Sequence, residues 1–349
     1  MKRRRRRPSC RRRRTFGEFT LGTPQRSRRR RVAQRSLSRA LVPALIAVTI
    51  LSLVIISGIL LRSLRTRKLN MELAALHAGQ AASGAAAPAA TEEPLPADTP
   101  ADFSALPTVS TPEPSPEPFP EVLAASSSAA EKTASTRFHQ VGGTPLSHME
   151  TLYNQNHDLI GWLSIPDVID LPVMYRDNTY YLTHDFNRSK NAAGTLFLDE
   201  DHRFTEKTQN LLLHGHNMKD GTMFGRLVHY LQDIAYYRSH PFVRFDTLWE
   251  TEEYVIFAVM RVPLDVQDER FINYFSHPTF VNDAAFDAYV RQLQLNSVYA
   301  VPIDVAPSDA LLTLSTCIDD DRLVVVCRRI RDGETHSKLN ELVRLAQKQ

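Results

Sequence analysis

Cys317 is the residue of this chain best placed to act as a nucleophile. It closes a short apolar run, Leu311–Leu314, after the hydroxyl residues Ser315 and Thr316. Three aspartates follow, and Arg322 then opens a second run that is rich in β-branched residues. Two such runs separated by turn residues predict neighbouring strands. The turn would bring the thiol and the guanidinium to the same end of the pair, as a nucleophile beside an anion stabiliser.

An acid for this chemistry is predicted at the end of another apolar run. Leu211–Leu213 is followed by His214-Gly215-His216. Histidine titrates near pH 6.5 and can donate a proton to a departing amine. A guanidinium stays charged and suits the oxygen of a tetrahedral intermediate. We therefore predict a constellation of Cys317, Arg322 and one of these histidines, in which the thiolate is the reactive form.

The same residues also have structural interpretations. Cys317 alone is compatible with a buried structural thiol, a common fate of free cysteines, and Arg322 alone with a solvated charge at a strand end. His214 and His216 have the His-x-His spacing of some metal sites, and His202 lies nearby. No convincing set of three or four ligands accompanies them. We therefore predict neither a metal nor a cofactor.

The elements that position these residues follow a strongly asymmetric N-terminal part. Residues 1–39 contain Lys2 and 16 arginines against the single acid Glu18, a net charge of +16. Residues 40–61 carry no charge and are long enough to cross a bilayer as a helix. A cleaved signal peptide normally has a shorter apolar core. The positive-inside rule then predicts a single-pass membrane anchor with a cytoplasmic N-terminus and an extracellular catalytic part.

The basic tail invites the hypothesis that it binds nucleic acid or anionic lipid. However, neither interleaved aromatic residues nor a folded nucleic-acid module accompanies its arginine runs. We interpret residues 1–39 as a cytoplasmic topology determinant and predict no nucleic-acid partner.

The remaining sequence divides into a spacer and a folded domain. Residues 62–136 are dominated by Ala, Pro, Ser, Thr and Glu, which predicts a disordered extracellular linker. Residues 137–349 contain many short β-type runs at irregular spacing and a few helices. The clearest helix, Asp283–Leu295, places Phe286, Tyr289, Val290 and Leu293 on one apolar stripe. This pattern predicts a mostly β fold, a closed or nearly closed β-barrel with peripheral helices.

These motifs resemble a known enzyme family. Thr313-Leu314-Ser315-Thr316-Cys317 is similar to the TLxTC signature of sortases, the membrane-anchored cysteine transpeptidases of Gram-positive bacteria. His216 matches their catalytic histidine, and Arg322 matches their catalytic arginine. Further stretches that resemble class B sortases are residues 161–166, 177–182, 194–199, 215–227 and 283–295. One departure is the segment between Cys317 and Arg322, which is shorter than in many relatives.

The resemblance implies a sortase-type barrel and a defined reaction. Cys317 would attack a C-terminal sorting signal of a secreted protein, of the NPxTx kind for class B, while Arg322 holds the carbonyl oxygen. His216 would protonate the leaving amine. The Cys317 thioester would then be resolved by an amine of a peptidoglycan precursor or of a pilin lysine. The residues expected to contact the donor peptide are Ser315, Thr316 and Asn217.

Two other functions stay open from the residues alone. A cysteine peptidase would use the same thiol, acid and oxyanion donor and would resolve the thioester with water. An inactive surface scaffold would keep the barrel without the reaction.

Overall fold

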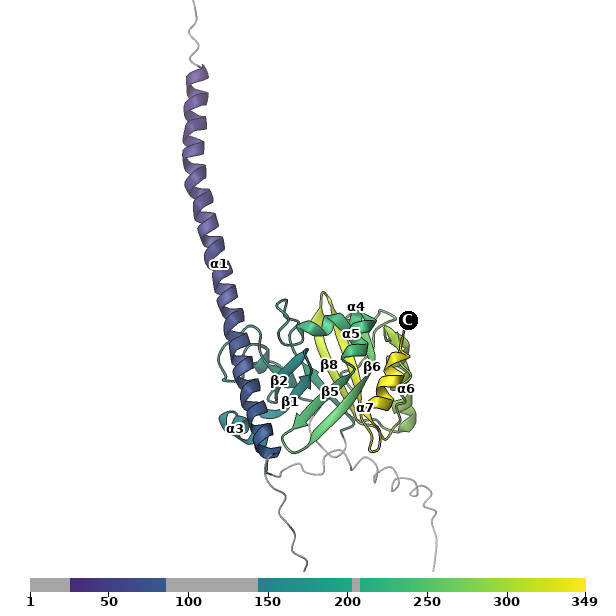
Figure 1. Cartoon of the computed structure of the whole chain (residues 1–349). Coiled ribbons are helices and arrows are strands. Elements are labelled where there is room, and N and C mark those ends of the chain that lie inside the picture. The colour runs from purple at the N-terminus through teal and green to yellow at the C-terminus, as the bar shows by residue number, and fades with distance from the viewer. Residues whose placement is uncertain (1–25, 86–143, 203–207) are drawn as a thin grey trace, which may run out of the picture. The chain divides into compact units, whose positions relative to one another are not determined.

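The computed structural model describes residues 26–85, 144–202 and 208–349, with side chains described from residue 43 to 81 in the first range. Two compact units are distinguished, Met1–Leu61 and Arg62–Gln349. Residues 1–25 of the predicted tail and residues 86–136 of the predicted linker lie outside the described residues. Figure 1 shows the arrangement of the elements within the second unit.

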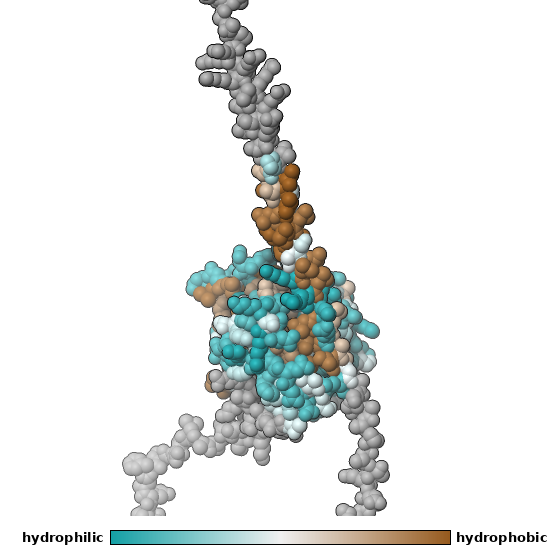
Figure 2. Space-filling model, turned by 90° about the vertical axis from the view of Figure 1, so that its left-hand side faces the viewer, coloured by the Kyte–Doolittle hydropathy of each residue, from teal (hydrophilic) through white to brown (hydrophobic). Residues whose placement is uncertain are grey.

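The first helix, α1 (Arg26–Ala85), is the one described helix that is long and apolar enough to cross a membrane. Its large apolar side chains between Leu45 and Leu61 are exposed, and they form the brown stretch of helix in Figure 2. Pro43 lies inside the helix. By length and composition alone, the candidate membrane span covers Pro43–Ala81, and the span at residues 40–61 stays a prediction.

The C-terminal part of α1 enters the segment that the sequence assigned to the linker. Within the second unit, Leu73 is 3% exposed and belongs to a cluster with Met149, Leu152 and Trp162. The physical reason is a stripe with four-residue spacing, Leu69, Leu73 and His77, which one helix face can bury. This short stripe was obscured by the Ala-rich composition around it.

The folded domain is a closed barrel, as predicted. Following the hydrogen-bonded order, its strands are β1 (Leu159–Ile165), β2 (Ile169–Met174), β3 (Leu196–Leu198), β4 (Asn210–His214), β8 (Leu311–Ile318), β9 (Asp321–Arg329), β6 (Thr251–Pro263) and β5 (Phe242–Thr247). Strand β5 pairs with β1 and closes the barrel. The β2–β3 and β4–β8 pairs are parallel, and the other pairs are antiparallel.

Helices lie on the outside of this barrel (Figure 1). They are α3 (Ser147–Gln155), α4 (Val228–Gln232), α5 (Ile234–Ser239), α6 (Asp283–Asn296) and α7 (His336–Arg344), with the 3-10 turns η1 (Tyr180–Leu182) and η2 (Gly225–Leu227). Short strands β7 (Tyr299–Ala300) and β10 (Gln347–Lys348) pair separately. The predicted stripe of α6, Phe286 to Leu293, is buried, because its residues recur at helical spacing.

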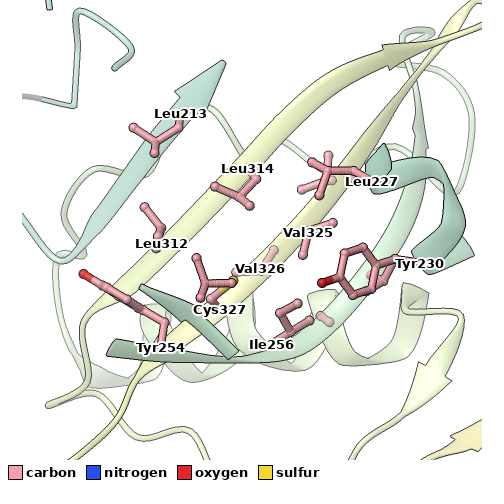
Figure 3. Close-up of a cluster of buried hydrophobic side chains, with 14 of the residues drawn as sticks. Leu213, Leu227, Tyr230, Tyr254, Ile256, Leu312, Leu314, Val325, Val326 and Cys327 are labelled. Carbon is pink, nitrogen blue, oxygen red and sulfur yellow. The ribbon is translucent and has the colours of Figure 1, made fainter. Parts of the chain in front are cut away.

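Strand β8 is buried on both faces from Leu311 to Thr316, and the alternation of its side chains decides which face each residue takes. Leu312 and Leu314 lie opposite Cys327 and Val325 of β9 and pack inside the barrel (Figure 3). Since successive side chains of a strand point to opposite faces, Cys317 is placed on the other face. The hydrophobic core therefore dictates the direction of the candidate nucleophile.

Candidate active site

Cys317 and Arg322 lie directly opposite each other in the antiparallel β8–β9 pair. Opposed residues of such a pair share one face of the sheet, with Cβ atoms about 4.5–5.5 Å apart. Nη1 of Arg322 donates a hydrogen bond to Sγ of Cys317. The Cys317 thiol is free and exposed, and Arg322 is half-buried. An accessible sulfur beside a permanent cation is the arrangement predicted from the sequence.

A tight acidic turn maintains this opposition. Ile318 pairs with Asp321, which leaves only Asp319 and Asp320 in the loop. Asp319 adopts a φ of 49°, in the left-handed region that aspartate tolerates better than most residues. Arg261 of β6 pairs with the Asp319 carboxylate at 3.2 Å and also bonds Asp321. The short segment that departs from the family pattern is thus a hairpin turn that sets Arg322 opposite the thiol.

The histidine motif reaches the same end of the sheet because β4 runs parallel to β8. His214 is the register partner of Ser315. Just beyond the strand, the Gly215 N–H donates to the Ser315 carbonyl oxygen at 3.3 Å, and the Thr316 hydroxyl donates to the Gly215 carbonyl oxygen at 2.6 Å. These bonds continue the pairing up to the residue before the thiol.

His216 lies in this loop but contacts another element. Its Nε2 atom is 2.8 Å from the Leu182 carbonyl oxygen. Because a carbonyl only accepts, Nε2 carries the proton in this arrangement. Among the described residues, no hydrogen bond joins the His216 ring to the Cys317 thiol. The link is indirect, since the Asn217 side-chain amide donates to the Cys317 carbonyl oxygen at 2.9 Å.

Gly215, which lies between His214 and His216 in the sequence, packs closely against the side chains of Leu196 and Phe224. A Cβ atom at this position would meet Cδ2 of Phe224 at 2.8 Å and would also contact the Leu196 side chain. Real Cβ atoms do not approach other heavy atoms this closely, so one of the neighbours would have to move. The glycine therefore lets the His216 loop pass against the hydrophobic core.

Ser315 and Thr316 are both buried, although they are neighbours in β8 and point to opposite faces of the strand. Each is 2% exposed. The Ser315 hydroxyl lies 2.9 Å from the Tyr274 hydroxyl. The Thr316 hydroxyl donates its hydrogen bond to the Gly215 carbonyl oxygen. Both hydroxyls make internal hydrogen bonds that position the end of β8. Their predicted contact with the donor peptide stays a prediction, as does that of Asn217.

Tyr274 was missed by the sequence analysis. It is 4% exposed, and burial raises the pKa of its phenol, which the Ser315 hydrogen bond lowers in part. Its segment between β6 and α6 has neither the alternation nor the periodicity that marks an element. Its contact with Ser315 arises only in the tertiary structure.

Asp199 was also missed, and it organises two of the three candidate histidines. Its carboxylate lies 2.9 Å from Nε2 of His214 and 3.2 Å from Nδ1 of His202. Burial raises the pKa of Asp199, but the hydrogen bonds from these histidines outweigh it and hold the pKa well below its usual range. In the described part of the chain, His202, His214 and His216 do not form a group that could hold a metal ion.

An exposed thiol beside a guanidinium on a closed barrel indicates a cysteine-dependent acyl-transfer enzyme. The sortase domain family matches residues 163–330 of the chain. Sortase B of Listeria monocytogenes is 34% identical over 181 residues, which cover 51% of this chain and 70% of that protein. Sortase B of Staphylococcus aureus is 29% identical over 189 residues, or 52% and 74% of the two chains.

A solved structure shares the fold. The crystal structure of sortase B from B. anthracis superposes with a TM-score of 0.50 at 27% identity, covering 58% of this chain and 93% of that one. The chain belongs to the sortase family and is a class B sortase, a cysteine transpeptidase.

Proposed function

We propose that Cys317 is the nucleophile of this transpeptidase, Arg322 its oxyanion donor and His216 its general acid and base. The observation that carries the proposal is the hydrogen bond from Arg322 to the exposed sulfur of Cys317. A guanidinium at this position attracts negative charge on the sulfur, and the thiolate is the reactive form.

The same guanidinium suits the next stage of the reaction. When the sulfur bonds to the carbonyl carbon of the scissile peptide, negative charge develops on the carbonyl oxygen. That oxygen then lies one bond from the carbon attached to Sγ, within reach of the Arg322 donors. Stabilisation by a charged donor held in place before the reaction is among the largest contributions to catalysis.

His216 completes the reaction by moving protons. The C–N bond breaks and the leaving amine takes a proton from His216, which leaves an acyl thioester on Cys317. The acceptor amine then attacks the thioester carbon, the C–S bond breaks, and the proton lost by the amine passes to His216. Nε2 of His216 bonds to the Leu182 carbonyl oxygen in this structure, so the proton moves either through Nδ1 or after the ring has turned away from Leu182.

The substrates are proposed from the resemblance to the family. The donor is a C-terminal sorting signal, NPxTx-like by resemblance, that contacts the neighbourhood of Asn217, Ser315 and Thr316. The acceptor is an amine of a peptidoglycan precursor or of a pilin. Helix α1 anchors the enzyme in the membrane through residues 40–61, with residues 1–39 in the cytoplasm and residues 137–349 outside. The basic residues before the span support this orientation.

Trapping of the thioester tests this proposal. The full chain in detergent is incubated with a library of sorting-signal peptides, denatured in acid, digested and analysed by mass spectrometry. An acyl group on the Cys317 peptide is expected, which also identifies the donor motif. Cys317→Ala should abolish the adduct. An acyl group on another residue, or turnover that persists in Cys317→Ala, would contradict the proposal.

A further inference from the structure

A second cluster of histidines lies away from the thiol, within the unit Arg62–Gln349. It consists of His77 on α1, His148 on α3 and Asp246 on β5. One imidazole nitrogen of each histidine and a carboxylate oxygen of Asp246 all lie within 4.8 Å of one another. Three segments that are far apart in the sequence each contribute one side chain to this point.

The imidazole nitrogens of this cluster are buried without hydrogen-bond partners. Nε2 of His77 and Nε2 of His148 are both inaccessible and have no hydrogen-bond partner among the described residues. His77 as a whole is only 8% exposed. An unsatisfied buried polar atom is costly and calls for an explanation. Both nitrogens point at the same carboxylate, at distances of 3.5 and 3.7 Å from Oδ2 of Asp246.

Ion pairing with Asp246 does not account for the two histidines. Arg244 already makes two hydrogen bonds to this carboxylate, at 2.7 and 2.8 Å. The charge of Asp246 is thus matched by a guanidinium, so the carboxylate does not need a charged histidine as its partner. Neutral imidazoles leave two lone pairs or N–H groups that converge on one oxygen at distances too long for good hydrogen bonds.

The spacing of the donor atoms fits a metal ion. Two ligands that each lie about 2.0–2.1 Å from a tetrahedral Zn²⁺ are roughly 3.4 Å apart. The nitrogen-to-oxygen distances of 3.5 and 3.7 Å are close to this value. Two imidazoles and a carboxylate suit Zn²⁺ better than Ca²⁺ or Mg²⁺, which prefer oxygen ligands.

The surroundings hold the ligands in place. The His77 ring stacks on the buried indole of Trp162, with centroids 4.4 Å apart and an interplanar angle of 6°. It meets the His148 ring edge-on at 5.2 Å. Arg244 donates to both oxygens of the Asp246 carboxylate and so fixes its orientation, the kind of support that metal-binding carboxylates usually have.

We propose that His77, His148 and Asp246 bind a Zn²⁺ ion that joins the C-terminal part of α1 to the barrel. The sequence predicted no metal site on the basis of His202, His214 and His216. His77 falls in the predicted linker, where no ligand is expected. A bound ion would stabilise the packing of residues 62–81 on α3 and β1. It would act as a structural element, separate from the thiol chemistry.

Zinc titration of the full chain tests the proposal. The starting protein, called the parent below, carries Cys10→Ser and Cys317→Ala, so that the buried Cys327 is its one remaining thiol, and it has no polyhistidine tag. It is purified in detergent, stripped with a chelator and titrated with Zn²⁺ against a chromophoric competitor. We expect one ion per chain, and X-ray absorption should show nitrogen and oxygen ligands without sulfur.

Variants decide whether the cluster is the site. His77→Gln and His148→Gln should each weaken Zn²⁺ binding at least tenfold. Loss of a residue that only hydrogen-bonds a metal ligand already lowers metal affinity about 10- to 100-fold. His157→Gln, an exposed histidine just after α3, is the matched control and should leave binding unchanged. No saturable binding by the parent, or equal binding by the parent and both variants, would overturn the proposal.

Hydrogen exchange separates loss of the ligand from loss of the fold. In the parent, Zn²⁺ should slow amide exchange over residues 62–81, and in His148→Gln it should not. Without Zn²⁺, the parent and the variant should exchange at similar rates over β8 and β9 if the barrel is intact. If Zn²⁺ does not change the rate of amide exchange over residues 62–81 of the parent, the proposal is also contradicted.

Discussion

The side-chain amide of Asn217 donates a hydrogen bond to the backbone carbonyl oxygen of Cys317 at 2.9 Å. This contact joins the loop that carries one candidate catalytic residue to the strand that carries the other. It involves the main chain of Cys317 and leaves the thiol free. The distance between the imidazole and the thiol is thereby governed by a residue that need not react.

Asn217→Ala should therefore slow the reaction without unfolding the protein. The loss of one hydrogen bond corresponds to ~1 kcal/mol, so a looser His216 loop should reduce kcat about fivefold. Peptide transfer assays and thermal melting provide the two readouts. A fall in melting temperature that accounts for all lost activity would argue against a positioning role.

Arg322→Lys should lose nearly as much activity as Arg322→Gln. Lysine keeps the charge but not the fixed pattern of guanidinium donors, and loss of an oxyanion donor costs about 10²–10³ in rate. The measurement is kcat/KM for transfer. Arg291→Lys, an exposed change on α6, is the control and should be silent. Full activity of the lysine variant would show that charge alone suffices.

Gly215→Ala should destabilise the domain, since its Cβ would collide with Phe224 and Leu196. Overpacking of this kind typically costs about 1–3 kcal/mol, which denaturant unfolding can measure. Gly79→Ala on α1 is a matched control, because nothing lies within 4 Å of its added Cβ. Equal stability of the two variants would mean that the side chains of Leu196 and Phe224 can shift to accommodate the added methyl group without measurable cost.

The stabilising effect of Asp199 should depend on pH. Its folded-state pKa is held below the usual range, because hydrogen bonds from His202 and His214 outweigh the effect of burial. A depressed pKa contributes stability that is present above the unfolded pKa of about 3.9 and is lost as the pH falls towards the folded value. Asp199→Asn should therefore be less stable than the wild type at pH 6, with a smaller difference at pH 3.

Urea unfolding at both pH values measures this difference. Asp287→Asn, an exposed change on α6, is the control. If Asp199→Asn and the wild type differ in free energy of unfolding by the same amount at pH 3 and pH 6, ionisation of the Asp199 carboxyl group does not cause the difference.

The fate of the thioester should depend on the acceptor. With a sorting-signal peptide alone, water is the only nucleophile and slow hydrolysis is expected. An added amine, such as a peptidoglycan-precursor peptide, should give the transfer product at the expense of hydrolysis, which mass spectrometry can quantify. Hydrolysis unaffected by any amine would favour a peptidase for the substrates tested.

Some features could be predicted from local pattern alone. The apolar runs that end at Cys317 and His214 became strands β8 and β4, and the helix expected at Asp283–Leu295 is α6. The strand predictions succeeded because a short continuous apolar run is typical of a strand buried on both faces, and the helix prediction because a period of 3.6 reflects burial of one face. Cys317 lies opposite Arg322 because the turn between β8 and β9 contains only Asp319 and Asp320, which fixes the pairing of the residues on either side.

The contacts between distant segments could not be predicted in this way. Tyr274 reaches Ser315 from an irregular loop, and Asp199 meets His214 only because β3 pairs with β4. His77 was hidden in a composition that resembles a linker. Each of these residues has an ordinary polar side chain whose sequence neighbours give no sign of its partner.

By itself, the sequence determined the chemistry of the candidate site, the barrel class and the apolar helix, because residue type and periodicity are local properties. Only the tertiary structure decided that Arg322 contacts the sulfur while His216 bonds to Leu182. It also decided that Leu73, in the C-terminal part of α1, packs with residues of α3 and β1. The reason is physical. Such contacts depend on how the barrel closes, and closure depends on the pairing of strands that are far apart in the chain.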